Sequence, residues 1–188
     1  MSKLVVSEFV SIDGVMEDPG GGESFERGGW AFQFERGAEG DRFKYDELMG
    51  AGAMLLGRVT YEGFAQAWPN MQADEFAQKM NSMPKYVVSS TLQSADWNNS
   101  TIMGGDLAKQ VAELVQSVEG DILVAGSARL VQALTDLGLV DEYRLMVYPI
   151  VLGDGKRLFS DTSQARSLRL VDAKPLDSGI LALTYQPA

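Results

Sequence analysis

The chain of 188 residues contains no cysteine and no histidine. Without cysteine it forms no disulfide and has no thiolate nucleophile, and without histidine it has no imidazole base. Zinc sites that use cysteine or histidine ligands are excluded for the same reason, and we expect no metal. Chemistry carried by a bound organic cofactor remains open, because the protein then only binds, orients and relays a proton.

Basic residues are also scarce, and no long apolar run is present. The net charge is −10 and the sequence pI is about 4.5, whereas nucleic-acid binding is built on clustered lysine and arginine. No stretch reaches the roughly 18 to 20 apolar residues of a membrane span, and the apolar run after Lys3 is broken at Glu8. We therefore expect a cytoplasmic protein that binds neither nucleic acid nor membrane.

Hydrophobic residues make up 45% of the chain, which suffices for one sizeable core, and a single domain over residues 1–188 is expected. Apolar runs typical of strands alternate with stretches of helical periodicity. The expected strands cover 3–14, 53–57, 85–90, 121–126 and 142–151. The expected helices cover 41–49, 60–68, 74–80, 106–118 and 127–137.

The C-terminal third predicts a hairpin of two further strands, 167–174 and 179–186. Repeated strand–helix alternation requires helices on both faces of a central sheet, since parallel strands need crossover connections. The fold class expected is therefore α/β: a three-layer α-β-α arrangement with a mixed, mostly parallel sheet. The segment 17–29 is too rich in glycine and charge for regular structure and predicts a loop.

Two strand-to-helix junctions have the composition of a phosphate site. At the first, a strand ends in Gly57-Arg58 and Thr60 is placed to cap the next helix. At the second, a strand ends at Gly126 and a helix opens with Ser127. Free N–H groups at a helix start bind phosphate, although each junction alone is equally an ordinary capped helix. Two of them in one sheet suggest a dinucleotide cleft.

Hydroxyl groups follow a third strand. Ser89 and Ser90 stand at its end, where they either bind a ribose or a phosphate at the carboxyl edge of the sheet or satisfy a turn. Asp13, in the turn after the first strand, has two readings of equal weight: it hydrogen-bonds a substrate, or it holds its own turn. Asp41 is placed to cap the helix that follows it.

Five segments, in matching order along almost the whole chain, resemble the reductase domain of bifunctional riboflavin-biosynthesis deaminase/reductases, within the dihydrofolate reductase superfamily. They are VSIDGVME (10–17), LLGRVTYEGF (55–64), MPKYVVSSTL (83–92), ILVAGSARLVQAL (122–134) and VDEYRLMVYPIVLGDGKRLF (140–159). The deaminase domain is missing from this chain, and its zinc ligands cannot exist without histidine and cysteine.

The resemblance implies a dihydrofolate reductase-like fold that binds NADPH. It places Gly57, Arg58 and Thr60 at the cofactor phosphates, Ser89 and Ser90 near the adenosine ribose, and 126–129 around the pyrophosphate, which adds Ala128 and Arg129 to Gly126 and Ser127. Many relatives have glycine at position 127, and an arginine often grips the 2′-phosphate near positions 90 and 91. These departures leave NADH open beside NADPH.

The same resemblance places substrate-binding groups on the other side of the cleft. Asp41 stands about where dihydrofolate reductases keep their substrate-binding carboxylate. Asp13, in the turn after the first strand, is the competing carboxylate, so Asp41 and Asp13 are the candidate catalytic acids. Trp30, which is otherwise a buried structural tryptophan, and Tyr45 are the candidate aromatic contacts to substrate.

The function expected is an NAD(P)H-dependent reductase that transfers hydride to a small heterocycle: a 5-amino-6-(5-phosphoribosylamino)uracil-like compound, a pteridine or a folate. The alternative is a catalytically silent dinucleotide-binding protein of the same fold. The apolar strand 144–152 predicts a homodimer, guided by the family.

Overall fold

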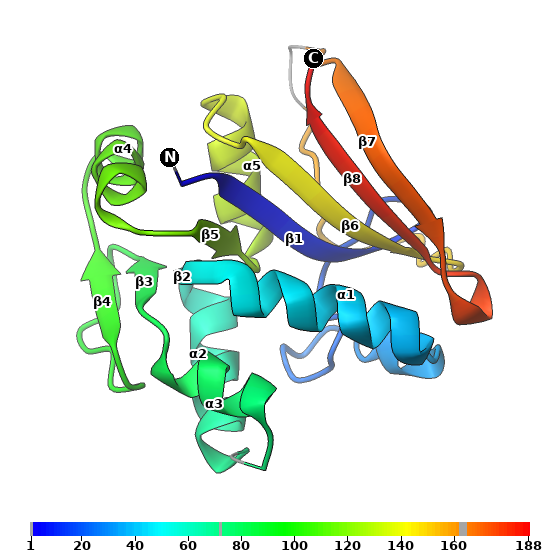
Figure 1. The fold of residues 1–188 in the computed structure, drawn as a ribbon, viewed down its shortest axis with the longest axis horizontal. Coiled ribbons are helices and arrows are strands. Elements are labelled where there is room, and N and C mark those ends of the chain that lie inside the picture. Colours follow the sequence, from blue (N-terminus) through cyan, green and yellow to red (C-terminus); the bar gives the residue numbers. More distant parts are fainter. Residues whose placement is uncertain (1, 72, 162–164) are drawn as a thin grey trace.

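The computed structural model describes residues 2–71, 73–161 and 165–188. They form an eight-stranded sheet in the order β4-β3-β2-β5-β1-β6-β8-β7 (Figure 1). All pairings from β4 to β6 are parallel, and β8 runs antiparallel to β6 and β7. The strands are β1 (Leu4–Ser11), β2 (Ala51–Gly57), β3 (Lys85–Val88), β4 (Ser100–Met103), β5 (Asp121–Val124), β6 (Glu142–Tyr148), β7 (Leu168–Pro175) and β8 (Leu181–Pro187).

Helices cover both faces of this sheet. One face carries α1 (Gly37–Gly50), α2 (Arg58–Ala67) and α3 (Glu75–Ser82), whose apolar residues share one core cluster. The other carries α4 (Leu107–Ser117) and α5 (Ala128–Asp136), which belong to a second cluster. Short 3-10 turns are η1 (Trp30–Gln33), η2 (Trp68–Asn70) and η3 (Asp177–Gly179). The expected three-layer, mostly parallel fold with its antiparallel C-terminal strands is confirmed.

Parallel strands buried on both faces are expected to be apolar along their whole length. β2 follows this rule, since six of its seven residues are buried and the other is half-buried. β1 departs from it, because the polar residues Ser7 and Glu8 interrupt the strand and are nevertheless buried. The groups that satisfy these two side chains lie at the candidate site.

Two helix starts differ from those expected. α1 begins at Gly37, so Asp41 is its fifth residue and the capping role expected for Asp41 is wrong. Gly37 and Gly40 are poor helix formers that conceal the first turn in the sequence. Thr60 is the third residue of α2, which starts directly after Gly57, and among the described residues no side chain caps this helix.

The apolar strand that suggested a homodimer lies inside the sheet. β6 is paired with β1 on one side and β8 on the other, and its residues are buried or half-buried. Its hydrophobic surface is therefore used within the fold, and the homodimer stays a prediction without that argument. No helix of the described residues has the length and apolar character that crossing a membrane requires.

Lys85 holds one corner of the structure together. Its side chain is fully buried, and Nζ donates to the backbone oxygens of Met83 at 2.8 Å, Asn98 at 2.8 Å and Asn81 at 3.1 Å. The ammonium also stands 4.2 Å from the ring centroid of Trp97. Burial lowers the pKa of Lys85 to about 8. One cation thus ties the end of α3 to the segment before β4.

We expect Lys85→Met to lower the free energy of unfolding by about 2 kcal/mol, because it leaves these three carbonyl oxygens without their donor. Urea unfolding followed by circular dichroism measures this change. Lys109→Met is the matched control, since the Lys109 side chain is 75% exposed. Equal stability of the two variants would show that water replaces the ammonium at no cost.

Candidate functional site

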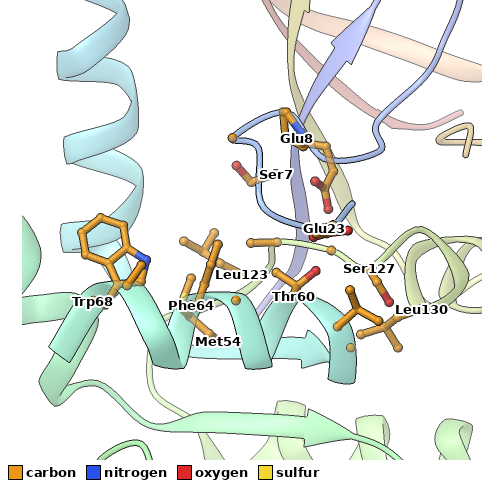
Figure 2. Close-up of a pocket in the computed structure, with 18 of the residues that line it drawn as sticks. Ser7, Glu8, Glu23, Met54, Thr60, Phe64, Trp68, Leu123, Ser127 and Leu130 are labelled. Atoms are coloured by element: carbon orange, nitrogen blue, oxygen red, sulfur yellow. The ribbon is translucent and has the colours of Figure 1, made fainter. Parts of the chain in front are cut away.

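A cavity of about 2130 Å³ opens at the carboxyl edge of β1 to β5 (Figure 2). In open α/β sheets, ligands bind outside the carboxyl ends of the strands, at the point where the strand order reverses. The cavity is bordered by the ends of β2, β3 and β5, the N-termini of α2 and α5, and the loop after β1. It is therefore the principal candidate for a ligand site.

The two predicted junctions meet at the centre of this edge. The Gly57 N–H donates to the Gly126 oxygen at 3.0 Å. A Cβ on Gly57 would lie 2.2 Å from Ser127 Oγ, and one on Gly126, whose φ is +86°, would lie 2.5 Å from Thr60 Oγ1. Both positions therefore require glycine, and both junctions border the cavity.

This contact brings the N-termini of α2 and α5 side by side. Their unpaired N–H groups and dipoles favour an anion, and two arginines stand beside them. Arg58 is paired with Glu62 at 2.9 Å on the surface of α2. Arg129, at the start of α5, is exposed and makes no hydrogen bond or ion pair with any described residue. Arg129 is thus the readier of the two to bind phosphate.

The hydroxyl groups after β3 serve a turn and also border the cavity. Ser89 Oγ accepts from the backbone N–H groups of Thr91 at 3.2 Å and Leu92 at 3.0 Å. Ser90 is exposed, and both serines line the cavity next to the β2 junction. The Ser89 hydroxyl therefore satisfies its own turn, which is one of the two roles predicted for it. Ser90 faces solvent.

β1 brings a buried carboxyl to the same edge. Its pairing with β5 ends at Val6 and Val124, so Ser7 and Glu8 lie beyond the end of β5 and border the cavity. Glu8 is 8% exposed, and its Oε1 has no hydrogen-bond partner among the described residues. Figure 2 shows Glu8 next to Glu23, on the same side of the cavity.

Burial is the main cause that raises the pKa of Glu8, to about 8. A hydrogen bond from the Gly126 backbone and the charge of Lys44 act in the opposite direction, while the charges of Glu47 and Glu23 raise the pKa further. The pKa of Glu23 is also raised, first by burial and second by the charge of Asp18. Glu8 is consequently protonated at neutral pH.

Ser7 belongs to a second buried cluster with α1. Glu47 Oε2 accepts from Ser7 Oγ at 2.7 Å and from Lys44 Nζ at 2.5 Å, and the Glu47 side chain is 3% exposed. Arg144 on β6 stands 3.9 Å from the other oxygen, Oε1, which lacks a hydrogen bond within the described chain. The cluster combines the Ser7 hydroxyl of β1 with charged groups of α1 and β6, and it borders the cavity through Ser7, Lys44 and Glu47.

The two carboxylates proposed from the sequence lie in different places. Asp41 lines the cavity, but its side chain is 65% exposed and paired with Arg36 at 2.9 Å. Asp13 is not among the described residues that line it. Asp13 accepts from the N–H groups of Leu152 at 3.0 Å and Gly153 at 2.7 Å. Its contacts are those of a residue that holds its own turn and the loop after β6.

Trp30 and Tyr45, the two aromatic residues proposed to contact substrate, are also not among the described residues that line the cavity. Trp30 is fully buried, donates from Nε1 to the Glu17 oxygen at 2.9 Å, and packs edge-on against Tyr148. Tyr45 donates to Glu75 at 2.5 Å and so connects α1 with α3. Phe32, two residues after Trp30, borders the cavity instead and is 81% exposed.

Sequence reasoning missed Glu8, Lys44, Glu47 and Phe32 as site residues. The available signal was the break in the β1 pattern, since a charged residue inside an apolar strand needs a partner or a function. Among the described residues, no group of three His, Cys, Asp or Glu side chains is placed to hold a metal ion.

The geometry fits a dinucleotide phosphate group. The glycine cradle of Gly57 and Gly126 is a space that a Cβ would fill, and it stands between two helix N-termini. Beside it lies the Arg129 guanidinium, which has no hydrogen-bond or ion-pair partner among the described residues. A diphosphate needs this combination of backbone donors and cationic charge.

Two proteins of Bacillus subtilis are similar in sequence to this chain. The chain is 31% identical over 144 residues to the uncharacterized protein YyaP of Bacillus subtilis (strain 168), covering 74% of this chain and 76% of that protein. It is 27% identical over 178 residues to the uncharacterized protein YwjB of the same organism, covering 95% of this chain and 94% of the other.

Solved structures share the fold. A putative riboflavin biosynthesis protein from Shewanella sp. PV-4 superposes with a TM-score of 0.78 at 18% identity, covering 100% of this chain and 99% of the other. Dihydrofolate reductase from Enterococcus faecalis, complexed with NADP(H), gives 0.64 at 14% identity, covering 98% and 96%. The model of the RibD C-terminal domain matches residues 2–182. The chain therefore belongs to the RibD C-terminal domain family and has the dihydrofolate reductase-like reductase fold.

Proposed function

We propose that this protein is an NAD(P)H-dependent reductase that transfers hydride to a small heterocyclic substrate. The observation that carries the proposal is the glycine cradle, where Gly57 and Gly126 bring two helix N-termini together at the edge of the sheet. Membership of the RibD C-terminal domain family supports it, as does the fold shared with a reductase that binds NADP(H).

The strand order lays out the groups that an extended dinucleotide needs. Along the edge β3-β2-β5-β1 stand serine hydroxyls, then the two junctions, then Ser7 and Glu8. Three strand spacings cover about 14 Å. We assign the adenosine ribose to Ser89 and Ser90, the diphosphate to Gly57, Arg58, Thr60 and 126–129, and the nicotinamide to the region of β1.

When bound, the reduced nicotinamide supplies a hydride from its ring carbon C4. The chain's own contribution is to bind and to exclude water. Gly57, Gly126 and Arg129 hold the phosphates, which fixes the ring at a distance set by the fold. The loop residues 16–23 and Phe32 border the opposite side, where they shield the reacting atoms from solvent.

The substrate is assigned to the space between β1, α1 and Phe32. A Thermotoga maritima deaminase/reductase with the same fold is described as a 5-amino-6-(5-phosphoribosylamino)uracil reductase, and this chain spans 57% of its length. We propose a heterocycle of related size, a pyrimidine, pteridine or folate, contacted by Phe32 and by the charged groups Asp41 and Lys44. A role in riboflavin biosynthesis is part of this proposal.

Arg129→Ala should weaken NADPH and NADH by about tenfold each, because it removes a charge-assisted contact to the diphosphate that both share. Quenching of tryptophan fluorescence measures binding. Trp68 lines the cavity, whereas Trp30 and Trp97 are buried, so Trp68→Phe should remove most of the signal.

Arg169→Ala on β7 is the matched control and should bind like wild type. If Arg129→Ala weakens the binding of NADPH but not of NADH, Arg129 binds the 2′-phosphate and not the diphosphate. Absence of binding of either dinucleotide to the folded wild type would refute the proposed function. Tight binding without turnover of any candidate heterocycle, unchanged in Asp41→Asn, would identify a silent binding protein.

Gly126→Ala should abolish NADPH binding and lower the free energy of unfolding by about 1 to 3 kcal/mol. The new Cβ would meet Thr60 Oγ1 at 2.5 Å, and the φ of +86° strains any side chain. Gly50→Ala, at the end of α1, is the control, since a Cβ there has no neighbour within 4 Å and Gly50 is not among the described residues that line the cavity. Wild-type affinity in Gly126→Ala, measured by titration beside urea unfolding, would exclude the cradle as the phosphate site.

A further inference from the structure

Glu8 is a buried carboxyl that the fold does not require. It interrupts an apolar strand, it is 8% exposed, and its Oε1 has no hydrogen-bond partner among the described residues. Burying a polar atom without a hydrogen-bond partner lowers the stability of the fold, and an apolar side chain in place of Glu8 would avoid that cost. The side chain borders the cavity at the point where β5 ends, so a ligand there is within its reach.

The groups that face Glu8 come from every element around it. Lys44 and Glu47 lie on α1, Glu23 lies on the loop after β1, and the Gly126 backbone lies at the start of α5. Lys44 is already bound to Glu47 and Ser7, both at 2.5 Å. Its charge is therefore shared, and it does not neutralise Glu8 by direct contact. Glu8 keeps its proton at neutral pH.

Few other groups at the cavity can give a proton at neutral pH. The chain has no histidine or cysteine, and no tyrosine is among the described residues that line the cavity. Asp41 is mostly exposed and paired with Arg36. Lys85, which is buried against the Trp97 ring, is not among the described residues that line the cavity.

Of the described residues, three buried acids line the cavity: Glu8, Asp18 and Glu47. Glu47 is bound to Ser7 and Lys44, and Asp18 lies on the loop after β1, so Glu8 is the buried acid on the strand to which the nicotinamide is assigned.

We infer that Glu8 is the catalytic proton donor of this reductase. The inference rests on the proposed function and adds to it the acid. Reduction of a C=N or C=O bond needs one proton at the heteroatom in addition to the hydride, and a positioned carboxylic acid delivers it.

Hydride transfer moves two electrons from the reduced nicotinamide, which is oxidised, to the carbon of the C=X bond, and the π pair moves to the heteroatom X. The O–H bond of Glu8 breaks as the X–H bond forms, which leaves a carboxylate. That carboxylate faces Glu23 and Glu47, so it is unfavourable and takes a proton from water entering through the open cavity. The same charges disfavour an anionic group at the reacting end.

Glu8→Gln tests the role, because glutamine keeps the shape and loses the acid. NADPH oxidation is followed with 5-amino-6-(5-phosphoribosylamino)uracil and with dihydrofolate as probes. We expect kcat to fall about 100-fold or more with KM and NADPH affinity within a factor of three. Wild-type kcat should decrease as pH rises through about 8, and this decrease should be absent from the variant. Glu39→Gln, on the exposed surface of α1, should behave as wild type.

The protonation of Glu8 can also be measured without turnover, in the ¹³C NMR spectrum of glutamate-labelled protein with NADP⁺ bound. The resonance missing from Glu8→Gln should titrate near pH 8. The variant should also unfold at a higher urea concentration than wild type at pH 8. The raised pKa of Glu8 stabilises the wild type fully only below the unfolded pKa, and that stabilisation is lost as pH rises toward 8.

A Glu8 resonance that titrates below pH 5 would overturn the inference, and so would Glu8→Gln turnover equal to wild type. Either result leaves the reductase assignment standing, because wild-type turnover is intact. A wild type that binds no dinucleotide, or that binds one and reduces neither probe, would instead refute the proposed function, and the acid role with it.

Discussion

The hydrogen bond from Gly57 to Gly126, with no room for a Cβ on either residue, is the constraint on which the site depends. It draws two strand-to-helix junctions into contact, although they are separated by almost 70 residues of chain. The N-termini of α2 and α5 consequently point into one cavity. A larger residue at either position would separate the junctions, and the backbone donors would no longer converge.

The architecture could be predicted because the buried parallel strands other than β1 are apolar runs and most of the helices have an apolar stripe. The errors fall where local sequence does not determine structure. The start of α1 was hidden by Gly37 and Gly40, which are weak helix formers held by packing. β4, with the sequence STIM, was not predicted, because a short edge strand needs no apolar run.

The junction residues of the site could be predicted for the same reason, since glycine and a helix start are adjacent in sequence. Roles that depend on tertiary placement could not. Trp30 and Tyr45 have the right chemistry, but one is packed on Tyr148 and the other bonds Glu75, while Phe32 borders the cavity. Glu8 was missed because its burial depends on where β5 ends, which only the register of β1 and β5 reveals.

The net charge of −10 conceals a cavity with two different ends. Around the glycine cradle stand two helix N-termini, Arg58 and Arg129, which suit a diphosphate. One strand further along, burial raises the pKa of Glu8, and the charges of Glu47 and Glu23 raise it further. In the proposed complex, a dinucleotide bound across this edge would have its diphosphate at the cationic end and its reduced, neutral ring beside Glu8. The strand order thus keeps the proposed anchor of the cofactor apart from the proposed proton donor, so that neither would weaken the other.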